Sequence, residues 1–471
     1  MSVLDRVDSV IGQATEASVA AHHRRRLARI GQTSAYAPPQ DGSLWAAGDP
    51  PPRDGCTLDV LIDGDEALPR MAEAIEGARD YVHIAGWHVT PGFGLTRDRD
   101  ARPLRELLAS VAERADVRVL LWAGAPVPVF SPKRRDVRKV RDELVRGTRV
   151  RCALDAKERP MHCHHEKLVI VDGEVAFVGG IDLTSLAGDR YHEPRHPVRG
   201  GIGWHDVSTR VRGPAVADVD EHFAARWSEV TGEPISACAP PPPAGSTTLQ
   251  IVRTVPERVY DFLPRGHFRI LESYVRALRS AQSLVYLENQ FLWSPEIVRI
   301  LAAKLREPPS DDFRLVVLLP AHPNNGADDT RGQLGVLAEA DAGAHRFLAA
   351  TITSRTGSVT DALYVHAKVG IVDDAWLTIG SANLNEHSLF NDSEMNVVTC
   401  DPEIARQTRL RLWAEHLERS EDEVAGDPAR VVDELWRPAA KQPGGHLREL
   451  SGVSRRSAAL RGPLQSLVVD G

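Results

Sequence analysis

Cysteine is scarce in this chain of 471 residues, and the few that occur form no recognisable pattern. They are scattered, odd in number and without a Cys-x-x-Cys pair: Cys56, Cys152, Cys163, Cys238 and Cys400. This distribution argues against a disulfide framework and against a zinc site. It favours a reducing compartment, in which thiols stay free.

Long apolar runs are also absent. No stretch approaches the roughly 20 apolar residues that a helix needs to cross a bilayer. Residues 1–30 lack the basic start, apolar core and small-residue cleavage site of a secretory signal. We therefore expect a cytoplasmic protein. Any membrane contact would be peripheral and made by the surface, which composition does not describe.

The chain has fewer basic residues than acidic ones. The chain has 57 Lys and Arg against 65 Asp and Glu, for a formal net charge of −8. Tight non-specific nucleic-acid binding requires many phosphate contacts from Lys and Arg, so no nucleic-acid partner is expected. One local basic run covers residues 131–145 (SPKRRDVRKVRDELV). It either docks on an anionic membrane or is an ordinary solvated helix face, which is the more common case.

What the chain does contain is an internal repeat. The segments Ala78–Trp87 (ARDYVHIAGW) and Ala281–Gln290 (AQSLVYLENQ) each follow a helical pattern, resemble buried strands and start 203 positions apart. The segments His164–Leu183 (HHEKLVIVDGEVAFVGGIDL) and Val365–Leu384 (VHAKVGIVDDAWLTIGSANL) are also alike, and their central histidines, at 165 and 366, are 201 positions apart. Two elements with nearly the same spacing indicate a duplicated domain.

A proline-rich segment separates the two copies. Residues 239–246 read APPPPAGS, and such a run is extended and continues neither a helix nor a central strand. Strands that alternate with helical patterns predict α/β halves with mostly parallel sheets covered by helices. The expected fold is two similar α-β-α halves related by a pseudo-twofold axis. We divide the chain into an N-terminal extension (1–55), a first half (56–238), a linker (239–248), a second half (249–438) and a C-terminal tail (439–471).

Each copy carries a His-x-Lys-x4-Asp motif. In the first copy, His165 and Lys167 precede the run LVIV, and on a strand their side chains would share one face. Asp172 and the glycine after it form a strong hairpin-turn signal, so we interpret the aspartate as structural before catalytic. The second copy repeats the layout with its own histidine, lysine and turn aspartate: His366, Lys368 and Asp373.

Bringing the halves together would gather two histidines, two lysines and a polar Gly-Ser-x-Asn turn around one point. This set suits a phosphodiester, because the lysines neutralise the non-bridging oxygens, while Asn383 and the backbone around Gly180 and Ser381 add fixed donors. Two histidines permit covalent catalysis, in which one attacks phosphorus and the other protonates the leaving oxygen. Side chains meet the charge, so we expect no metal and no other cofactor.

These motifs resemble the phospholipase D superfamily, whose signature is a doubled His-x-Lys-x4-Asp followed by Gly-Ser or Gly-Gly. The resemblance covers roughly residues 56–438 and is nearest to the plant and animal phospholipases D, without their N-terminal calcium- or lipid-binding modules. A minimal catalytic body of this kind is typical of bacteria. The segments that carry the resemblance are HHEK (164–167), GGIDL (179–183), WHD (204–206), LENQF (287–291), GSAN (380–383) and DSE (392–394).

The resemblance implies two α/β halves packed face to face, with one active site at their junction. It implies that His165 forms the phosphohistidine and that His366 is the general acid. Water or an alcohol then releases the intermediate. Asp206 and Glu394 match the carboxylates that orient the two rings and fix their tautomers. Which carboxylate serves which ring stays open.

The first turn departs from the generic pattern, since Gly180 and Asp182 stand where Ser and Asn are usual. A carboxylate beside a phosphate would repel it, so Asp182 either faces away or is neutralised by a lysine. Trp87 and Gln290 occupy matching strand ends and are candidate substrate contacts, although Trp87 is equally a candidate core residue. The loop over residues 188–203 either borders the entrance or is plain surface, with candidate lip residues Tyr191, His192 and Arg195.

The leading hypothesis is a phospholipase D that hydrolyses a phospholipid headgroup ester, with phosphatidyl transfer when an alcohol competes. Because both motifs lie on one chain, a monomer can complete the site. A phosphatidyltransferase of the cardiolipin-synthase kind commonly has N-terminal membrane spans, which are not seen here. The acidic charge weighs against a nuclease. A phosphate-binding scaffold is the non-enzymatic alternative, but both histidines and both lysines are present.

Overall fold

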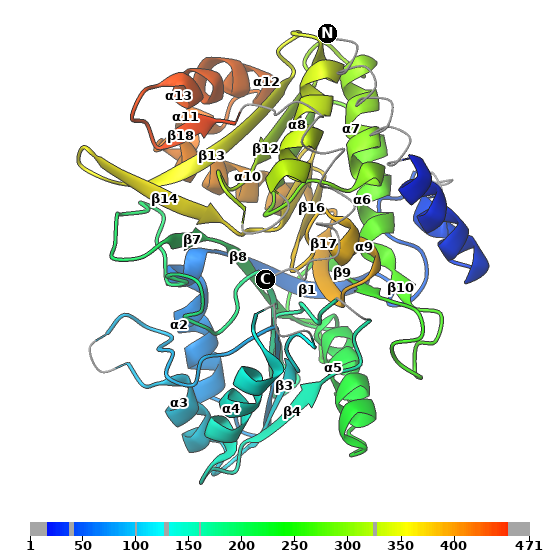
Figure 1. Cartoon of the computed structure of the whole chain (residues 1–471), viewed down its shortest axis with the longest axis vertical. Helices are drawn as coiled ribbons and strands as arrows, with labels where there is room; N and C mark the ends of the chain where they lie inside the picture. Colours follow the sequence, from blue (N-terminus) through cyan, green and yellow to red (C-terminus); the bar gives the residue numbers. More distant parts are fainter. Residues whose placement is uncertain are drawn as a thin grey trace.

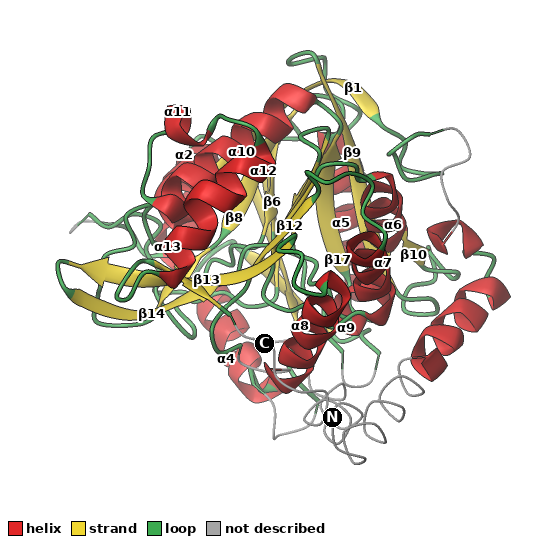
Figure 2. Ribbon diagram, turned by 90° about the horizontal axis from the view of Figure 1, so that it is seen from above, coloured by secondary structure: helices red, strands yellow, loops and turns green. Residues whose placement is uncertain are grey.

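The computed structural model describes residues 17–36, 42–98, 101–126, 131–159, 162–323 and 327–450. Two α/β halves make up the molecule, the first in the lower part of Figure 1 and the second in the upper part. Figure 2 shows helices on both sides of the central strands, so the strands form the middle layer. This confirms the predicted fold class, α/β with two similar halves.

The first half is one mixed sheet with the strand order β4-β3-β2-β5-β6-β8-β1. Its strands are β1 (Arg53–Ile62), β2 (Tyr81–Gly86), β3 (Asp116–Trp122), β4 (Arg151–Asp155), β5 (Leu168–Val171), β6 (Val175–Gly179) and β8 (Val207–Arg212). Its helices are α2 (Asp63–Glu76), α3 (Leu104–Val111), α4 (Arg134–Val145) and α5 (Val216–Thr231). Every residue of β5 is buried, as expected for the apolar run LVIV in the centre of a covered sheet.

The second half repeats this order as β13-β12-β11-β15-β16-β17-β9, and short strands β18 and β10 extend its two ends. Its strands are β9 (Thr247–Val255), β10 (His267–Phe268), β11 (Leu284–Glu288), β12 (Arg314–Leu318), β13 (Phe347–Thr356), β15 (Val369–Val372), β16 (Trp376–Gly380), β17 (Glu394–Thr399) and β18 (Leu447–Glu449). Its helices include α6 (Arg269–Ser280), α7 (Pro295–Arg306), α8 (Ala327–Asp341), α9 (Glu386–Phe390) and α10 (Pro402–Leu417).

The prediction of mostly parallel sheets is wrong. Only β2, β3 and β4, and their counterparts β11, β12 and β13, pair in parallel within the two sheets. The other neighbours are antiparallel, because each motif strand turns back at once through its Asp-containing turn. That hairpin then continues into further antiparallel strands.

The two sheets are joined to each other. Strand β1 pairs with β8 of its own half and also with β9 of the other, through Arg53↔Leu249 and Cys56↔Thr247. On another side of the junction, β7 (Gly203–His205) pairs in parallel with β14 (Val359–Val365). The halves are thus held by backbone hydrogen bonds as well as by side chains, which fixes the junction between them.

The segments at the two ends of the chain pack on the second half. Residues 17–29 are helical, and Arg26 forms a buried ion pair with Glu257 at 2.7 Å. After α10, the chain runs through α11 (Glu421–Val424), α12 (Pro428–Val431), a π-helical turn (Val432–Trp436) and α13 (Arg437–Lys441) before β18 pairs with β13. The predicted tail therefore packs on the body as far as residue 450, and its remainder lies outside the described residues.

The motif aspartates hold the turn of each hairpin to the strand beside it. Asp172 has φ 54° and Asp373 has φ 52°, a left-handed conformation that Asp tolerates better than most residues. The Asp172 carboxylate accepts hydrogen bonds from the backbone N–H groups of Arg79, Asp80 and Tyr81 at 2.8–2.9 Å. The Asp373 carboxylate accepts the equivalent three, from residues 282–284, at 2.7–2.8 Å. These contacts are structural.

We predict that Asp373→Ala lowers the thermal unfolding midpoint. The substitution removes the acceptor of three backbone N–H groups, and leaving such groups unsatisfied costs about 1–3 kcal/mol in total where they are partly solvated. Asp373→Asn is the matched control, because it keeps one side-chain oxygen and the tolerance for a left-handed conformation. Differential scanning calorimetry measures both variants. An Ala variant that unfolds at the wild-type temperature would contradict this role.

Candidate active site

The two motif histidines meet at the junction of the halves. The ring centroids of His165 and His366 are 6.5 Å apart, and both side chains are buried. The regular strands begin one residue after each motif lysine, so the histidines lie in the segments that lead into β5 and β15. Residues 201 positions apart in sequence therefore face a common point, at a separation that a single phosphoryl group can bridge.

Each histidine is oriented by a carboxylate of the opposite half. His165 Nδ1 lies 3.1 Å from Glu394 Oε1, and His366 Nδ1 lies 2.7 Å from Asp206 Oδ2. A carboxylate accepts, so each Nδ1 donates and each Nε2 is left with its lone pair. The sequence left this pairing open, and the structure resolves it as an exchange between the halves.

The two carboxylates are themselves held in place and are fully buried. Glu394 accepts from the Ser388 hydroxyl at 2.5 Å and from the hydroxyl of Ser381, while Asp206 accepts from the Val207 N–H at 2.9 Å. Burial raises the pKa of both carboxyl groups, against the lowering effect of neighbouring cations. These hydrogen bonds fix which way each carboxylate faces, and so fix the ring that it contacts.

Burial also acts on the second histidine. Desolvation, together with the cations of Lys368 and Arg190, holds the pKa of His366 well below its usual range. This favours a neutral His366 ring, which donates its Nδ1–H to Asp206 at 2.7 Å. A bound phosphodiester brings negative charge to this point and favours the charged ring.

Glycine and serine take equivalent places behind the two rings. A Cβ on Gly180 would lie 2.0 Å from Asp206 Oδ1, so the close approach of this carboxylate excludes any side chain there. At the matching position, Ser381 instead donates its hydroxyl to Glu394. Both residues were predicted to bind substrate through their backbone; in the structure the Gly180 N–H donates to the Val207 carbonyl and the Ser381 N–H to the Met395 carbonyl, both at 3.0 Å.

The two motif lysines are buried beside the histidines. Lys167 Nζ donates to the His165 carbonyl at 2.7 Å and pairs with Asp182 at 3.1 Å. Asp182 also accepts from the Trp87 N–H at 3.1 Å. Of the two predicted alternatives for Asp182, neutralisation by a lysine is therefore the one observed.

The second lysine has two amide side chains beside it. Lys368 Nζ donates to the His366 carbonyl and, at 3.3 Å, to Gln290 Oε1. Asn383, the counterpart of Asp182, donates to the same Gln290 oxygen at 3.4 Å. The Asn383 Oδ1 atom is buried without a hydrogen-bond partner among the described residues. Gln290 and Asn383 thus lie in the site.

Trp87 packs in a buried cluster, and the three candidate lip residues differ in exposure. The Trp87 side chain stacks on Trp122, at 6.1 Å between centroids, in a small buried cluster with Ala125 and Cys163, which favours the core interpretation. Of the candidate lip residues, His192 is fully buried, Tyr191 is half-buried and Arg195 is exposed. The basic run forms α4, whose cationic residues mostly face solvent.

Two residues that the sequence did not single out contact the site. The Trp204 ring lies 4.4 Å from the His366 ring, and the Arg190 guanidinium lies 3.2 Å from the Trp204 ring centroid. Arg190 is buried, and burial lowers its pKa to about 10. Its Nε and Nη1 atoms have no hydrogen-bond partner in the described part of the chain. Trp204 is the first residue of the WHD segment (204–206) and Arg190 lies in the loop over residues 188–203, so the sequence indicated both segments but not these two side chains.

Comparisons with known proteins agree with this geometry. A family described as "Phospholipase D" matches residues 74–203, and one described as "Cardiolipin synthase, PLD-like domain" matches residues 274–414. Phospholipase D A of Dictyostelium discoideum is 26% identical over 471 aligned positions, covering 78% of this chain but only 36% of the relative. Phospholipase D alpha 1 of Cynara cardunculus is 25% identical over 612 positions, covering 86% of this chain and 74% of the relative.

A solved structure also shares the fold. The crystal structure of phosphatidylserine synthase from Haemophilus influenzae Rd KW20 superposes with a TM-score of 0.54 and 11% identity, over 90% of this chain and 95% of that one. Among the described helices of this chain, none is long and apolar enough to span a membrane. Family models match each half, the two motif histidines converge and the mixed sheet is repeated. The chain therefore belongs to the phospholipase D superfamily.

Proposed function

We propose that this protein is a phospholipase D-type phosphodiesterase that cleaves a phospholipid headgroup ester through a phosphohistidine. The observation that carries the proposal is the pair of facing imidazoles, each oriented by a carboxylate of the other half. Two buried lysines beside them provide the positive charge that a phosphodiester needs. The relatives named phospholipase D support the same substrate class.

In the first step, His165 Nε2 attacks phosphorus and the bond from phosphorus to the headgroup oxygen breaks. His366, protonated when the anionic substrate is bound, gives its Nε2 proton to that leaving oxygen. The Lys167 and Lys368 ammonium groups face the non-bridging oxygens, where negative charge concentrates in the transition state. Glu394 stabilises the charge that develops on the His165 ring as it is phosphorylated.

In the second step, an oxygen nucleophile releases the intermediate. His366, now neutral, takes a proton from water, whose oxygen attacks phosphorus while the bond to His165 breaks. The products are phosphatidic acid and free His165. An alcohol in place of water gives a phosphatidyl alcohol by the same path. All the reacting groups come from one chain, and the two steps use side chains alone, so we propose that a monomer acts without a metal at the phosphate.

Phosphatidyl transfer to a lipid alcohol is the second candidate. The match of residues 274–414 to a family described as "Cardiolipin synthase, PLD-like domain" favours it. Incubation with phosphatidylcholine, phosphatidylglycerol or single-stranded DNA, each with and without ethanol, separates the candidates. Choline release with phosphatidylethanol supports the main proposal. Cardiolipin formation would replace it with the transferase, and DNA cleavage would replace it with a nuclease.

We predict that the two histidines have distinct roles. His165→Ala removes the nucleophile and should abolish turnover. His366→Asn removes the general acid and should lower kcat by about 10²–10⁴-fold. Because His366 also activates the water, the variant should accumulate labelled intermediate on His165 from a substrate with a good leaving group. Mass spectrometry of the quenched protein locates the label, and label on residue 366 of a His165→Ala variant would reverse the assignment.

We predict an acidic pH optimum. The ratio kcat/KM reports ionisation in the free enzyme, and the pKa of His366 is held well below the ordinary histidine value of 6.5. The charged acid is therefore lost as pH rises, and the alkaline limb should have its midpoint below pH 6.5. Arg190→Gln removes a cation near the ring and should move that limb to higher pH, whereas Arg190→Lys keeps the charge and should leave it near the wild-type position. An unmoved limb in Arg190→Gln would contradict the electrostatic role.

A further inference from the structure

A second buried cluster of histidines and carboxylates lies at the junction of the halves, and the proposed reaction does not use it. Its members come from the start of α2, the loop before β7, β7 itself, the end of β11, the end of α10 and the segment before β18. We call it the junction cluster, and it consists of Asp63, His196, His205, Glu288, Glu415, His416 and His446.

Negative charge in the junction cluster is matched by histidines. Within the described residues, the ion pairs of Asp63, Glu288 and Glu415 are all made with imidazoles. The side chains of the three carboxylates are at most 4% exposed. Buried carboxylates at this density require positive charge. The charge is either a set of protons on the rings or a bound cation.

The ring nitrogens distinguish these alternatives. His205 uses both nitrogens, at 3.0 Å from Asp63 and 2.9 Å from Glu288, as a charged ring would. The other three rings each keep one buried nitrogen without a hydrogen-bond partner among the described residues: His196 Nδ1, His416 Nδ1 and His446 Nε2. If these rings were charged, each of the three nitrogens would be a buried N–H group without an acceptor. If the rings are neutral, each of these nitrogens has a lone pair that could bind a cation.

The hydrogen-bond partners of His416 and His446 leave one nitrogen of each ring with a lone pair that could bind a metal ion. His416 Nε2 lies 2.8 Å from Glu288 Oε1, so it donates and leaves the Nδ1 lone pair free. His446 Nδ1 donates to the Thr353 carbonyl and leaves the Nε2 lone pair free. Metal-binding histidines usually donate their second nitrogen to a carboxylate or a carbonyl in this way.

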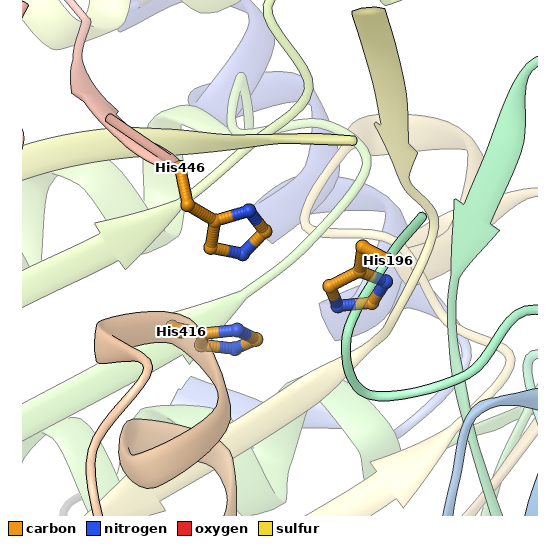
Figure 3. A group of neighbouring side chains, drawn as sticks. All are labelled: His196, His416 and His446. Atoms are coloured by element: carbon orange, nitrogen blue, oxygen red, sulfur yellow. The ribbon is translucent and has the colours of Figure 1, made fainter. Parts of the chain in front are cut away.

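We propose that His196, His416 and His446, with the Glu415 carboxylate, form a binding site for one divalent transition-metal ion of the zinc class. Figure 3 shows the three rings around a common space, from the loop before β7, from α10 and from the segment before β18. One nitrogen from each ring lies within 4.8 Å of the other two. Glu415 Oε1 lies 2.9 Å from His196 Nε2 and 3.9 Å from His416 Nδ1, so His196 would bind the ion through Nε2. Its ring proton would then sit on Nδ1, which lies 3.6 Å from the Asp63 carboxylate.

The chemistry of these ligands selects the ion. Three imidazoles and one carboxylate suit Zn²⁺ or a similar borderline ion and are poor ligands for Mg²⁺ or Ca²⁺, which prefer oxygen. Zn–N bonds of about 2.0–2.1 Å place tetrahedral ligand atoms roughly 3.4 Å apart. The rings must therefore move inward by up to about an ångström on binding, which side-chain rotation provides.

Such an ion would stabilise the structure and take no part in the reaction. It would tie together the loop of the first half that carries Arg190, helix α10 and the segment that leads into β18. His205, which also belongs to the junction cluster, accepts a hydrogen bond at its backbone carbonyl from the backbone N–H of His366, at 2.8 Å. The ion would thus brace the segment that positions His366 and Asp206 without contacting the reacting phosphorus.

The test is metal binding by the full chain, followed without reference to activity. Chelator-treated protein is titrated with Zn²⁺ and, separately, with Co²⁺. We expect one ion per chain by elemental analysis, visible Co²⁺ absorption of a tetrahedral site, and a higher thermal unfolding midpoint, because an ion that binds only the folded chain stabilises it. His446→Gln and Glu415→Gln should each weaken binding at least tenfold, and circular dichroism verifies that they fold.

His162→Gln is the matched control. His162, His387 and Asp392 form another group that could hold an ion, and it is closer to solvent. This variant should bind one ion with wild-type affinity. The proposal is overturned if the wild-type chain binds no stoichiometric ion, if His446→Gln and Glu415→Gln bind as the wild type does, or if binding is lost in His162→Gln instead.

Discussion

The hydrogen bonds from His165 to Glu394 and from His366 to Asp206 are the contacts on which the proposed chemistry depends. Each crosses from one half of the chain to the other, so neither half contains an oriented histidine by itself. The junction must be rigid for these bonds to hold, and the structure makes it so by running β1 into both sheets and by pairing β7 with β14. Backbone pairing here serves the geometry of the site.

The two motif lysines show that similar halves need not surround equivalent residues in the same way. Lys167 Nζ pairs with the Asp182 carboxylate, while Lys368 Nζ hydrogen-bonds the amide oxygen of Gln290. Burial raises the pKa of Asp206 and the charge of Lys368 opposes that rise, so each lysine has a carboxylate in its surroundings. The difference follows from one pair of equivalent positions, at which the first half has Asp182 and the second has Asn383.

The locally encoded features of this protein could be predicted from its sequence, whereas those that depend on contacts between distant segments could not. His165 and His366 were found because each belongs to a repeated motif, and the turn roles of Asp172 and Asp373 follow from their neighbours in the hairpin. The exchange of Asp206 and Glu394 could not be read, since it depends on how the halves face each other. The steric need for Gly180 and the stacking of Arg190 on Trp204 arise from approach in space. The junction cluster has no local spacing in the sequence, because the three rings of the proposed metal site lie on segments from residue 196 to residue 446. The few cysteines of the chain gave no hint of it.

The exchanged carboxylates also bear on how such a chain arose. When two identical subunits meet about a twofold axis, every contact between them occurs twice with the roles reversed, and the two histidine–carboxylate bonds have this reciprocal form. A homodimer of half-length subunits with these contacts would hold both histidine–carboxylate pairs on its axis. In a single chain the two copies need not be identical, and Gly180 opposite Ser381 is one such difference.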